Sequence, residues 1–485
     1  MRGQRPEPLD EGSRELGFRA RGYAGLLLYG GLNNAQAEFL LKNSGIQQGI
    51  EPTVVPRPAH NVSRDEISSS ALKVLYRLNK AGFQAFLVGG SVRDALLGLH
   101  PKDFDVVTDA HPDELKALFG NCRLIGRRFR LAHVRFGQEI IEVATFRAAS
   151  NGEEDRGDVA HDTHGRILRD NVYGTIGEDV WRRDFTCNAL YYNIADFSIW
   201  DYVGGVKDIE RRRLVLIGDP EKRLREDPVR MLRAIRFAAK LGFDIDVSVV
   251  NAMEKLRDLL SNVPPARLFD EFLKMFQGGF AGKTFELLWK HHLFAKLFPE
   301  TDAELEKDRV FGRLVQAALI STDQRVAQEK TVTPMFLLGV FLWAPIKRHA
   351  AELRQAEQIS DSQSLAIASH TVAGWQQSRI SIPRRYTGPM AEMLALQPRF
   401  ENNKGRRALN LLEHKRFRAA YDFMKLRAEV GDFDRELADF WTQAQIQSAE
   451  ERLQSFDVSA KAEPRKRRRR PKRGAGGGGG GHKDR

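Results

Sequence analysis

The sequence of 485 residues contains only two cysteines, Cys122 and Cys187. Two isolated thiols provide neither a disulfide framework nor the ligand spacing of a zinc site, which excludes a disulfide-stapled module and a zinc finger. Long apolar runs are also missing, because the best candidate, Tyr23–Leu32, is interrupted by glycines and is shorter than the about 18 residues that span a bilayer. We therefore expect no transmembrane segment and a reducing compartment, the cytoplasm.

The composition is that of a globular protein, with 42% hydrophobic and 29% charged residues. The length suggests roughly three domains. The net charge of +12 is uneven, because the segment Lys461–Arg485 contains eleven basic and two acidic residues. A concentrated cationic tail with a run of glycines cannot form a packed core and favours a polyanionic partner, nucleic acid first, over a plain solubility or localisation role. The expected RNA-binding residues are Arg465, Lys466, Arg467, Arg468, Arg469, Arg470, Lys472 and Arg473.

A strand, a glycine turn and a helix follow one another near residue 90. Ala85–Val88 reads as a short strand, Gly89-Gly90-Ser91 as the turn and Val92–Leu97 as the helix. Such a turn can present backbone N–H groups to phosphate. Further strands are predicted at Phe104–Val107, Ala132–Phe136 and Ile140–Phe146, and an amphipathic helix at Ile67–Leu78. The region up to about residue 200 is therefore predicted to be α/β.

From about residue 211 onward, helical periodicity dominates. Gly and Pro separate the predicted helices Val229–Leu241, Ala266–Phe276, Thr284–Leu297 and Phe417–Glu429. The second half is therefore predicted to be mainly helical.

Asp103 and Asp105 flank Phe104 in a predicted strand. The two-residue period of a strand places both carboxylates on one face and Phe104 toward the core. Paired carboxylates suit magnesium, which binds one or two of them together with substrate phosphates. Glu142, on another predicted strand, is a candidate third carboxylate. A solvated strand end for the pair, and a plain exposed residue for Glu142, are the alternatives.

Four motifs carry a family resemblance. LVGGSVRDALLG (Leu87–Gly98) followed by PKDFDVVTDA (Pro101–Ala110) resembles the head domain shared by bacterial poly(A) polymerases and CCA-adding tRNA nucleotidyltransferases. RRDFTCNALYYN (Arg182–Asn193) is similar to the Arg-Arg-Asp segment of that family, and REDPVRMLRAIRFAAKLGF (Arg225–Phe243) to its Glu-Asp-x-x-Arg helix.

The resemblance implies specific roles. Asp103 and Asp105 match the metal-binding catalytic pair, Glu142 the supporting metal ligand and Asp184 the catalytic aspartate of the Arg-Arg-Asp segment. The implied metal is magnesium, with manganese as the alternative, and the implied substrate is ATP. The implied nucleotide-binding residues are Gly89, Gly90, Ser91, Arg93, Arg183, Asp227, Arg230 and Arg233.

Ser91 stands where many members have glycine or alanine. Asp227 and Arg230 share a helix face and together could pair with a base edge; Asp227 also suits a helix N-cap. Arg233 and Arg236 continue that spacing, and either bind triphosphate or form a solvated basic face.

The implied fold is an α/β nucleotidyltransferase head, a small mixed sheet with helices, followed by mainly α-helical neck, body and leg domains and a disordered basic tail. We expect a low-information extension over 1–60, the catalytic head over 61–210 and the neck with nucleotide selection over 211–285. A helical body and RNA-binding region then covers 286–455, and the tail covers 456–485.

Poly(A) polymerases and CCA-adding enzymes share these catalytic motifs, so other segments must distinguish the two activities. NCRLIGRRFRLAHVRFG (Asn121–Gly137) and FRAAYDFMKLRAEVG (Phe417–Gly431) resemble the bacterial poly(A) polymerase versions. We therefore predict a template-independent adenylyltransferase that adds adenylate from ATP to RNA 3′ ends in mRNA processing and decay, acts as a monomer and meets RNA-decay proteins. The alternatives are a CCA-adding enzyme and an inactive RNA-binding protein. A phosphohydrolase is disfavoured, since His291-His292 looks structural.

Overall fold

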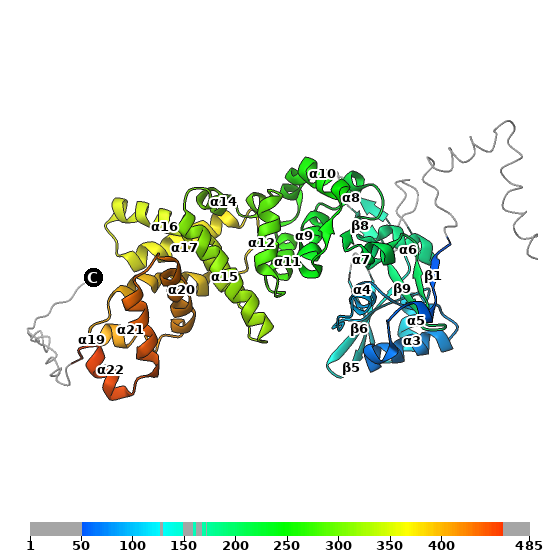
Figure 1. Ribbon diagram of the computed structural model, residues 1–485, viewed down its shortest axis with the longest axis horizontal. Coiled ribbons are helices and arrows are strands. Elements are labelled where there is room, and N and C mark those ends of the chain that lie inside the picture. Colours follow the sequence, from blue (N-terminus) through cyan, green and yellow to red (C-terminus); the bar gives the residue numbers. More distant parts are fainter. Residues whose placement is uncertain (1–50, 127–129, 149–158, 162–166, 171, 459–485) are drawn as a thin grey trace, which may run out of the picture. The chain divides into compact units, whose positions relative to one another are not determined.

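The structure is a computed structural model that describes residues 51–126, 130–148, 159–161, 167–170 and 172–458 (Figure 1). The chain forms two compact units, each described by itself. Among the described residues, the first, called the head unit, comprises those up to 148 together with 172–182 and 189–204. The second, called the helical unit, comprises 159–161, 167–170, 183–188 and 205–458. The predicted tail residues 465–470, 472 and 473 lie outside the described residues.

The head unit is built on a mixed sheet with the strand order β1-β10-β9-β2-β3-β6-β5-β4. Neighbouring strands are antiparallel except β3 and β6, which are parallel. The strands are β1 (Thr53–Val55), β2 (Ala85–Val88), β3 (Asp105–Thr108), β4 (Cys122–Ile125), β5 (Leu131–Phe136), β6 (Glu139–Thr145), β9 (Leu190–Asn193) and β10 (Ile199–Asp201). The α/β expectation for this region is confirmed.

Strand β1 lies inside the segment that we assigned to an N-terminal extension ending at residue 60. Thr53–Val55 pairs with β10 in antiparallel register, and the ring of His60 hydrogen-bonds to the carbonyl of Phe197 at 2.9 Å. The structured part of the head therefore begins before residue 61. Three residues without periodicity carry too little pattern to predict a strand, because β1 gains its hydrogen bonds only from its neighbour.

Helix α3 (Ser69–Lys80) covers one face of the sheet. Its buried residues Ala71, Val74, Leu75 and Leu78 follow the helical period and pack against β2, β3 and β6. Ser68 caps the helix by accepting the N–H of Ala71. The other head helices are α4 (Gly90–Leu96), α5 (Pro112–Leu118) and α6 (Ile176–Arg182).

The helical unit is almost entirely α-helical in its described part. Its main helices are α7 (Gly205–Glu210), α8 (Pro220–Glu226), α9 (Val229–Leu241), α10 (Val247–Leu256), α11 (Pro265–Phe276), α12 (Ala281–Lys290), α13 (Phe294–Leu297), α14 (Pro299–Leu305), α15 (Arg309–Ala327), α16 (Pro334–Glu357), α17 (Asp361–Gln376), α18 (Arg384–Ala395), α19 (Gly405–Leu409), α20 (Phe417–Val430), α21 (Arg435–Ile446) and α22 (Ala449–Ser455). Two short strand pairs, β7 (Val159–His161) with β8 (Ile167–Asp170) and β11 (Arg213–Leu214) with β12 (Asp244–Ile245), also belong to it.

One predicted helix is wrong. The segment Thr284–Leu297 forms two helices, α12 and α13, because the chain turns at His292, whose φ of 54° lies in the left-handed region. His291 beside it is buried, and burial together with Lys290 lowers its pKa. Among the described residues no His, Cys, Asp and Glu side chains gather in a group of three that could hold a metal ion. A structural role for the His291-His292 pair stays a prediction.

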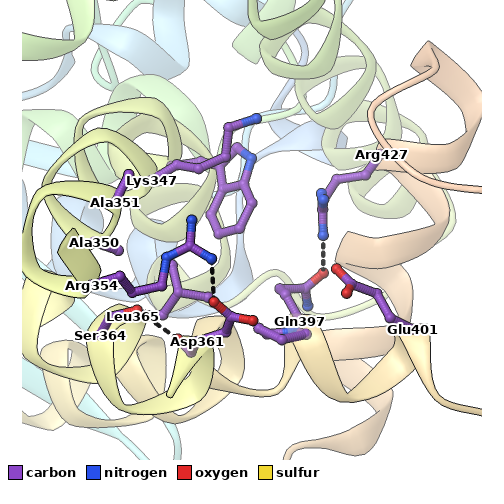
Figure 2. A pocket seen from close by; sticks show the side chains of 12 residues that line it. Lys347, Ala350, Ala351, Arg354, Asp361, Ser364, Leu365, Gln397, Glu401 and Arg427 are labelled. Atoms are coloured by element: carbon purple, nitrogen blue, oxygen red, sulfur yellow. Dashed lines mark hydrogen bonds and ion pairs between the residues drawn. The ribbon is translucent and has the colours of Figure 1, made fainter. Parts of the chain in front are cut away.

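A polar cavity of about 230 Å³ lies in the helical unit between α16, α17, α20 and the 3-10 turn Gln397–Glu401 (Figure 2). Its cations are already paired: Arg354 with Asp361, and Arg427 with Gln397 at 3.1 Å and with Asp432 at 2.7 Å. No helix among the described residues has the length and apolar character needed to cross a membrane.

Candidate active site

The predicted catalytic carboxylates lie at the start of β3. Asp103 and Asp105 are exposed, whereas Phe104 and Val106 are buried, which confirms the predicted alternation. The strand begins only at Asp105, so Asp103 lies in the irregular segment before it and the predicted strand Phe104–Val107 is displaced by one residue. This segment and the start of the strand therefore present both carboxylates to solvent.

Glu142 lies beside Asp105 on the neighbouring strand. The parallel register of β3 and β6 makes Asp105 and Glu142 direct partners, and directly opposed residues share one face of a sheet. Their neighbours Val106 and Val143 form the next pair, on the opposite face, and both are buried. The register of the two strands therefore places Glu142 beside Asp105 on the same face of the sheet, and its role as a metal ligand stays a prediction.

These carboxylates suit a hard divalent cation. They supply oxygen donors from a strand end, and the Glu142 side chain is 51% exposed, so substrate oxygens can approach. The three carboxylates do not converge into a complete ligand set. Magnesium commonly takes only one or two carboxylates and completes its octahedron with water and substrate phosphate, so an incomplete protein set fits it.

Only Gly89 of the predicted glycine turn precedes α4, because Gly90 and Ser91 already form the first turn of this helix, two residues before its predicted start at Val92. Gly89 has φ of 79° and ψ of −132°, a conformation that only glycine adopts without strain. Ser91 is buried and its hydroxyl donates to the carbonyl of Val88 at 3.3 Å. Arg93 is 2% exposed and its guanidinium is paired with Asp94, with Nη2 to Oδ1 at 2.6 Å. In this structure both side chains shape the turn, and their contact with a triphosphate stays a prediction, as does that of Gly90.

Asp184 forms the core of a charge network in the helical unit. Its Oδ2 accepts hydrogen bonds from Arg233, with Nε at 2.7 Å and Nη2 at 2.5 Å, and its Oδ1 accepts from Asn188 and from the N–H of Phe185. Burial alone would raise the pKa of Asp184, but the charge and hydrogen bonds of Arg233 outweigh it, and the pKa is lowered. The carboxylate is therefore held in its ionised form.

Asp227 and Arg230 do not act as one open pair in this structure. Arg267 of α11 donates to both oxygens of Asp227, at 2.9 and 2.6 Å. Arg230 instead donates to the carbonyl of Arg223 at 2.6 Å and to Glu226 at 3.1 Å. In this structure the two side chains therefore have different partners, from α11 and α8, and their joint contact with a base stays a prediction. Asp227 Oδ1 also accepts the N–H of Val229, close to the predicted capping role.

Arg236 fits neither of the two alternatives that its spacing allowed, triphosphate binding and a solvated basic face. Its Nε lies 2.6 Å from Glu271 of α11, and both side chains are largely buried.

Arg183, a predicted nucleotide-binding residue, contacts α8 through its backbone, because its carbonyl accepts a hydrogen bond from Arg223. Sequence reasoning missed Arg223, Arg267 and Glu271, because only the packing of α8 and α11 against α9 gives them these partners.

Three family models match the chain. "Poly A polymerase head domain" matches residues 85–215, "Probable RNA and SrmB- binding site of polymerase A" matches 242–305, and "Polymerase A arginine-rich C-terminus" matches 357–474. The first covers the glycine turn, β3 and β6; the last includes the predicted RNA-binding arginines.

Curated relatives cover most of the chain. Poly(A) polymerase I of Escherichia coli O6:H1 is 49% identical over 78% of this chain and 82% of the relative. Poly(A) polymerase I of Haemophilus influenzae is 41% identical over 87% of this chain and 95% of the relative. The CCA-adding enzyme of Bacillus pumilus is 38% identical, but over 51% of this chain and 58% of that enzyme.

A solved structure shares the fold. The CCA-adding enzyme of Bacillus stearothermophilus, in complex with CTP, matches with a TM-score of 0.52 and 24% identity over 81% of this chain and 88% of that one. The carboxylates in register, the glycine turn and the extent of the matches lead to one assignment: the chain belongs to the poly(A) polymerase family of nucleotidyltransferases.

Proposed function

We propose that the chain transfers adenylate from ATP to the 3′ end of RNA without a template and releases pyrophosphate. The observation that carries the proposal is the register of β3 and β6, which sets Asp105 beside Glu142, with Asp103 two residues before. A binding protein that had lost the chemistry would have no need of exposed acidic residues on one strand edge, since carboxylates repel RNA phosphates.

Asp103, Asp105 and Glu142 would hold a divalent cation, magnesium or alternatively manganese. When bound, it lowers the pKa of the attacking hydroxyl and neutralises charge on the phosphates. The carboxylates themselves can accept a hydrogen bond from the RNA 3′-hydroxyl and so orient it beside β3. Catalysis then comes mainly from positioning and from charge stabilisation.

Nucleotide selection is proposed for the helical unit around Asp227. A carboxylate offers about four acceptor positions. Arg267 takes up one position on each oxygen, and the N–H of Val229 takes up another. One acceptor position therefore remains for a donor such as the amino group of a base. Arg267 holds the carboxylate in place for that contact.

Primer extension tests the proposal. Each nucleotide is offered separately, and CTP and ATP are also offered together, with magnesium or manganese, to an oligo(A) primer and to a tRNA lacking its terminal CCA. We expect a long ladder with ATP on oligo(A). Addition that stops after two cytidines and one adenosine on the tRNA would establish the CCA-adding alternative, whose relatives match only about half of this chain. RNA binding without extension would establish the inactive alternative.

The cellular setting remains part of the proposal. Cys122 and Cys187 are both free thiols, which supports a reducing compartment such as the cytoplasm. A monomer that meets RNA-decay proteins is retained as an expectation.

A further inference from the structure

The open face of the head sheet carries a row of polar side chains that runs across four strands. Asp105 of β3 is the register partner of Glu142 of β6, Glu142 of His133 of β5, and His133 of Arg123 of β4. Direct partners lie on the same face of a sheet. The four side chains therefore form one continuous row, which we call the polar row.

The opposite face of the same strands is apolar. The row Val106, Val143 and Ala132 is buried there, and α3 packs against β3 and β6. By contrast, Asp105, Glu142 and Arg123 are exposed, and the His133 side chain is 23% exposed. The polar row is therefore the face left for a ligand.

Charge changes sign along the polar row. Its inner end carries the two carboxylates, and its outer end carries Arg123. Arg135, two residues beyond His133 on the same face, adds a second exposed cation beside exposed Ile140. In the part of the chain that the structure describes, neither Arg123 nor Arg135 forms an ion pair with a carboxylate. The three arginines of α9 in the helical unit, in contrast, are paired with Glu226, Asp184 and Glu271.

His133 lies between the carboxylates and Arg123 in the polar row. Its Nε2 lies 3.4 Å from Oε1 of Glu142, within contact distance, but forms no hydrogen bond among the described residues. Strands lie about 4.8 Å apart, so Arg123 is roughly 14 Å from Asp105 across three strand spacings. The row thus separates the carboxylate site from Arg123 by a distance that spans more than one nucleotide. Arg135, whose Nε donates to the carbonyl of Gly137 at 3.0 Å, forms no ion pair among the described residues.

We propose that the polar row is the path of the RNA 3′ end over the head sheet. The terminal hydroxyl lies at Asp105 and Glu142, and upstream phosphodiesters lie on Arg123 and Arg135. This inference rests on the proposed function and adds the direction of the RNA. Contacts to phosphates give affinity and register without reading sequence, as a polymerase that extends its own product requires.

A structural explanation competes with this one. β4 is an edge strand, and charged residues on edge strands prevent pairing with other chains. That role requires only charge, so it predicts no change in primer affinity when Arg123 or Arg135 is replaced.

The test compares Arg123→Gln, Arg135→Gln and the double variant with Arg77→Gln. Arg77 is an exposed arginine on α3, which covers the opposite face of the sheet, so its replacement is the matched control. The kcat and KM for ATP and for RNA are measured in the full chain with oligo(A) primers of increasing length, beginning with the dinucleotide ApA.

We expect the double variant to raise the KM for long primers roughly tenfold and to leave the KM for ATP and the kcat at saturating primer unchanged. The loss should shrink toward ApA, which has a single phosphodiester and cannot reach Arg123. The salt slope of primer binding should fall by about 0.7 for each lost phosphate contact.

Unchanged KM for all primers, or an equal loss for ApA and for long primers, overturns the inference. Either result leaves the proposed function standing, because extension at saturating primer persists. If Asp105→Ala still extends RNA with ATP, the proposed function itself fails, whatever the arginine variants do.

Discussion

The carboxylate site on β3 and β6 of the head unit and helix α9 of the helical unit both contain several charged side chains. The charges at the carboxylate site are of one sign and exposed, whereas those on α9 are paired with opposite charges. At the strand edge, Asp105 and Glu142 lie in register and carry charges of the same sign on an exposed face. On α9, Arg233 and Arg236 are paired with Asp184 and Glu271 and are largely withdrawn from solvent.

The difference shows what each region can do. Like charges placed side by side cost free energy, which a bound cation would offset at Asp105 and Glu142. The pairs on α9 satisfy each other and hold α9 against α11 and the segment 183–188. The first region is therefore suited to bind a cation, and the second holds neighbouring segments of the helical unit together.

The largest expected effect on the rate comes from removing a carboxylate of β3. Asp105→Ala should lower the rate of nucleotide incorporation by on the order of 10³-fold, because a charge-stabilising group is lost where charge develops. Primer extension measures the rate, and circular dichroism should show a retained fold. Asp113→Asn, an exposed carboxylate on α5, serves as the control and should extend normally. Retained incorporation by Asp105→Ala would refute the assignment of this site.

A second experiment tests whether Asp227, which is paired with Arg267, also contributes to the preference for ATP. Asp227→Asn should reduce the preference for ATP over CTP by about 10-fold or more, because an amide cannot accept from both a base and Arg267 in the same way. Separate primer extensions with each nucleotide measure the ratio of kcat/KM. Glu221→Gln, which removes a carboxylate paired with Lys255 in the same unit, is the control. If Asp227→Asn only lowers stability, Asp227 belongs with the scaffold.

A third experiment probes a buried pair itself. Asp184→Asn should destabilise the chain by about 1–3 kcal/mol, because Arg233 loses its ionised partner. Urea unfolding followed by circular dichroism measures the change. Equal stability of the variant and the parent chain would show that the Asp184 pair does not hold the helical unit together.

The same pair predicts a pH dependence. The pKa of Asp184 is lowered in the folded chain, so the unfolded chain takes up the proton first as the pH falls. The stabilisation from ionised Asp184 is fully present above the unfolded pKa of about 3.9 and is lost as the pH drops through the folded pKa. The parent chain should lose more stability in this acidic window than Asp184→Asn does, which acid unfolding at a series of pH values can measure.

The smallest expected effect on the rate comes from the basic tail. Removing Lys461–Arg485 should weaken RNA binding and flatten its salt dependence, because eleven basic residues are lost. The kcat at saturating RNA should stay the same, since the carboxylates are untouched. Binding measured from low to high salt gives the slope, and an unchanged slope would assign the tail another role.

Local sequence patterns made elements of both units predictable. Strand β2 and helix α9 occur with the predicted bounds, and α20 differs by one residue. These elements have strong local periodicity, so their own residues specify them. The strand at Thr53–Val55 and the break at His292 have no such pattern, because one depends on pairing with β10 and the other on a single backbone conformation.

The sequence by itself determined which residues carry charge, which face of each strand is apolar and which motifs place the chain in its family. Those properties follow from residue type and from the periods of strand and helix, which are local. Only the tertiary structure decided which charges are available. It set Glu142 and His133 in register with Asp105, and it paired Asp227 with Arg267, because strand register and helix packing join residues far apart in the chain.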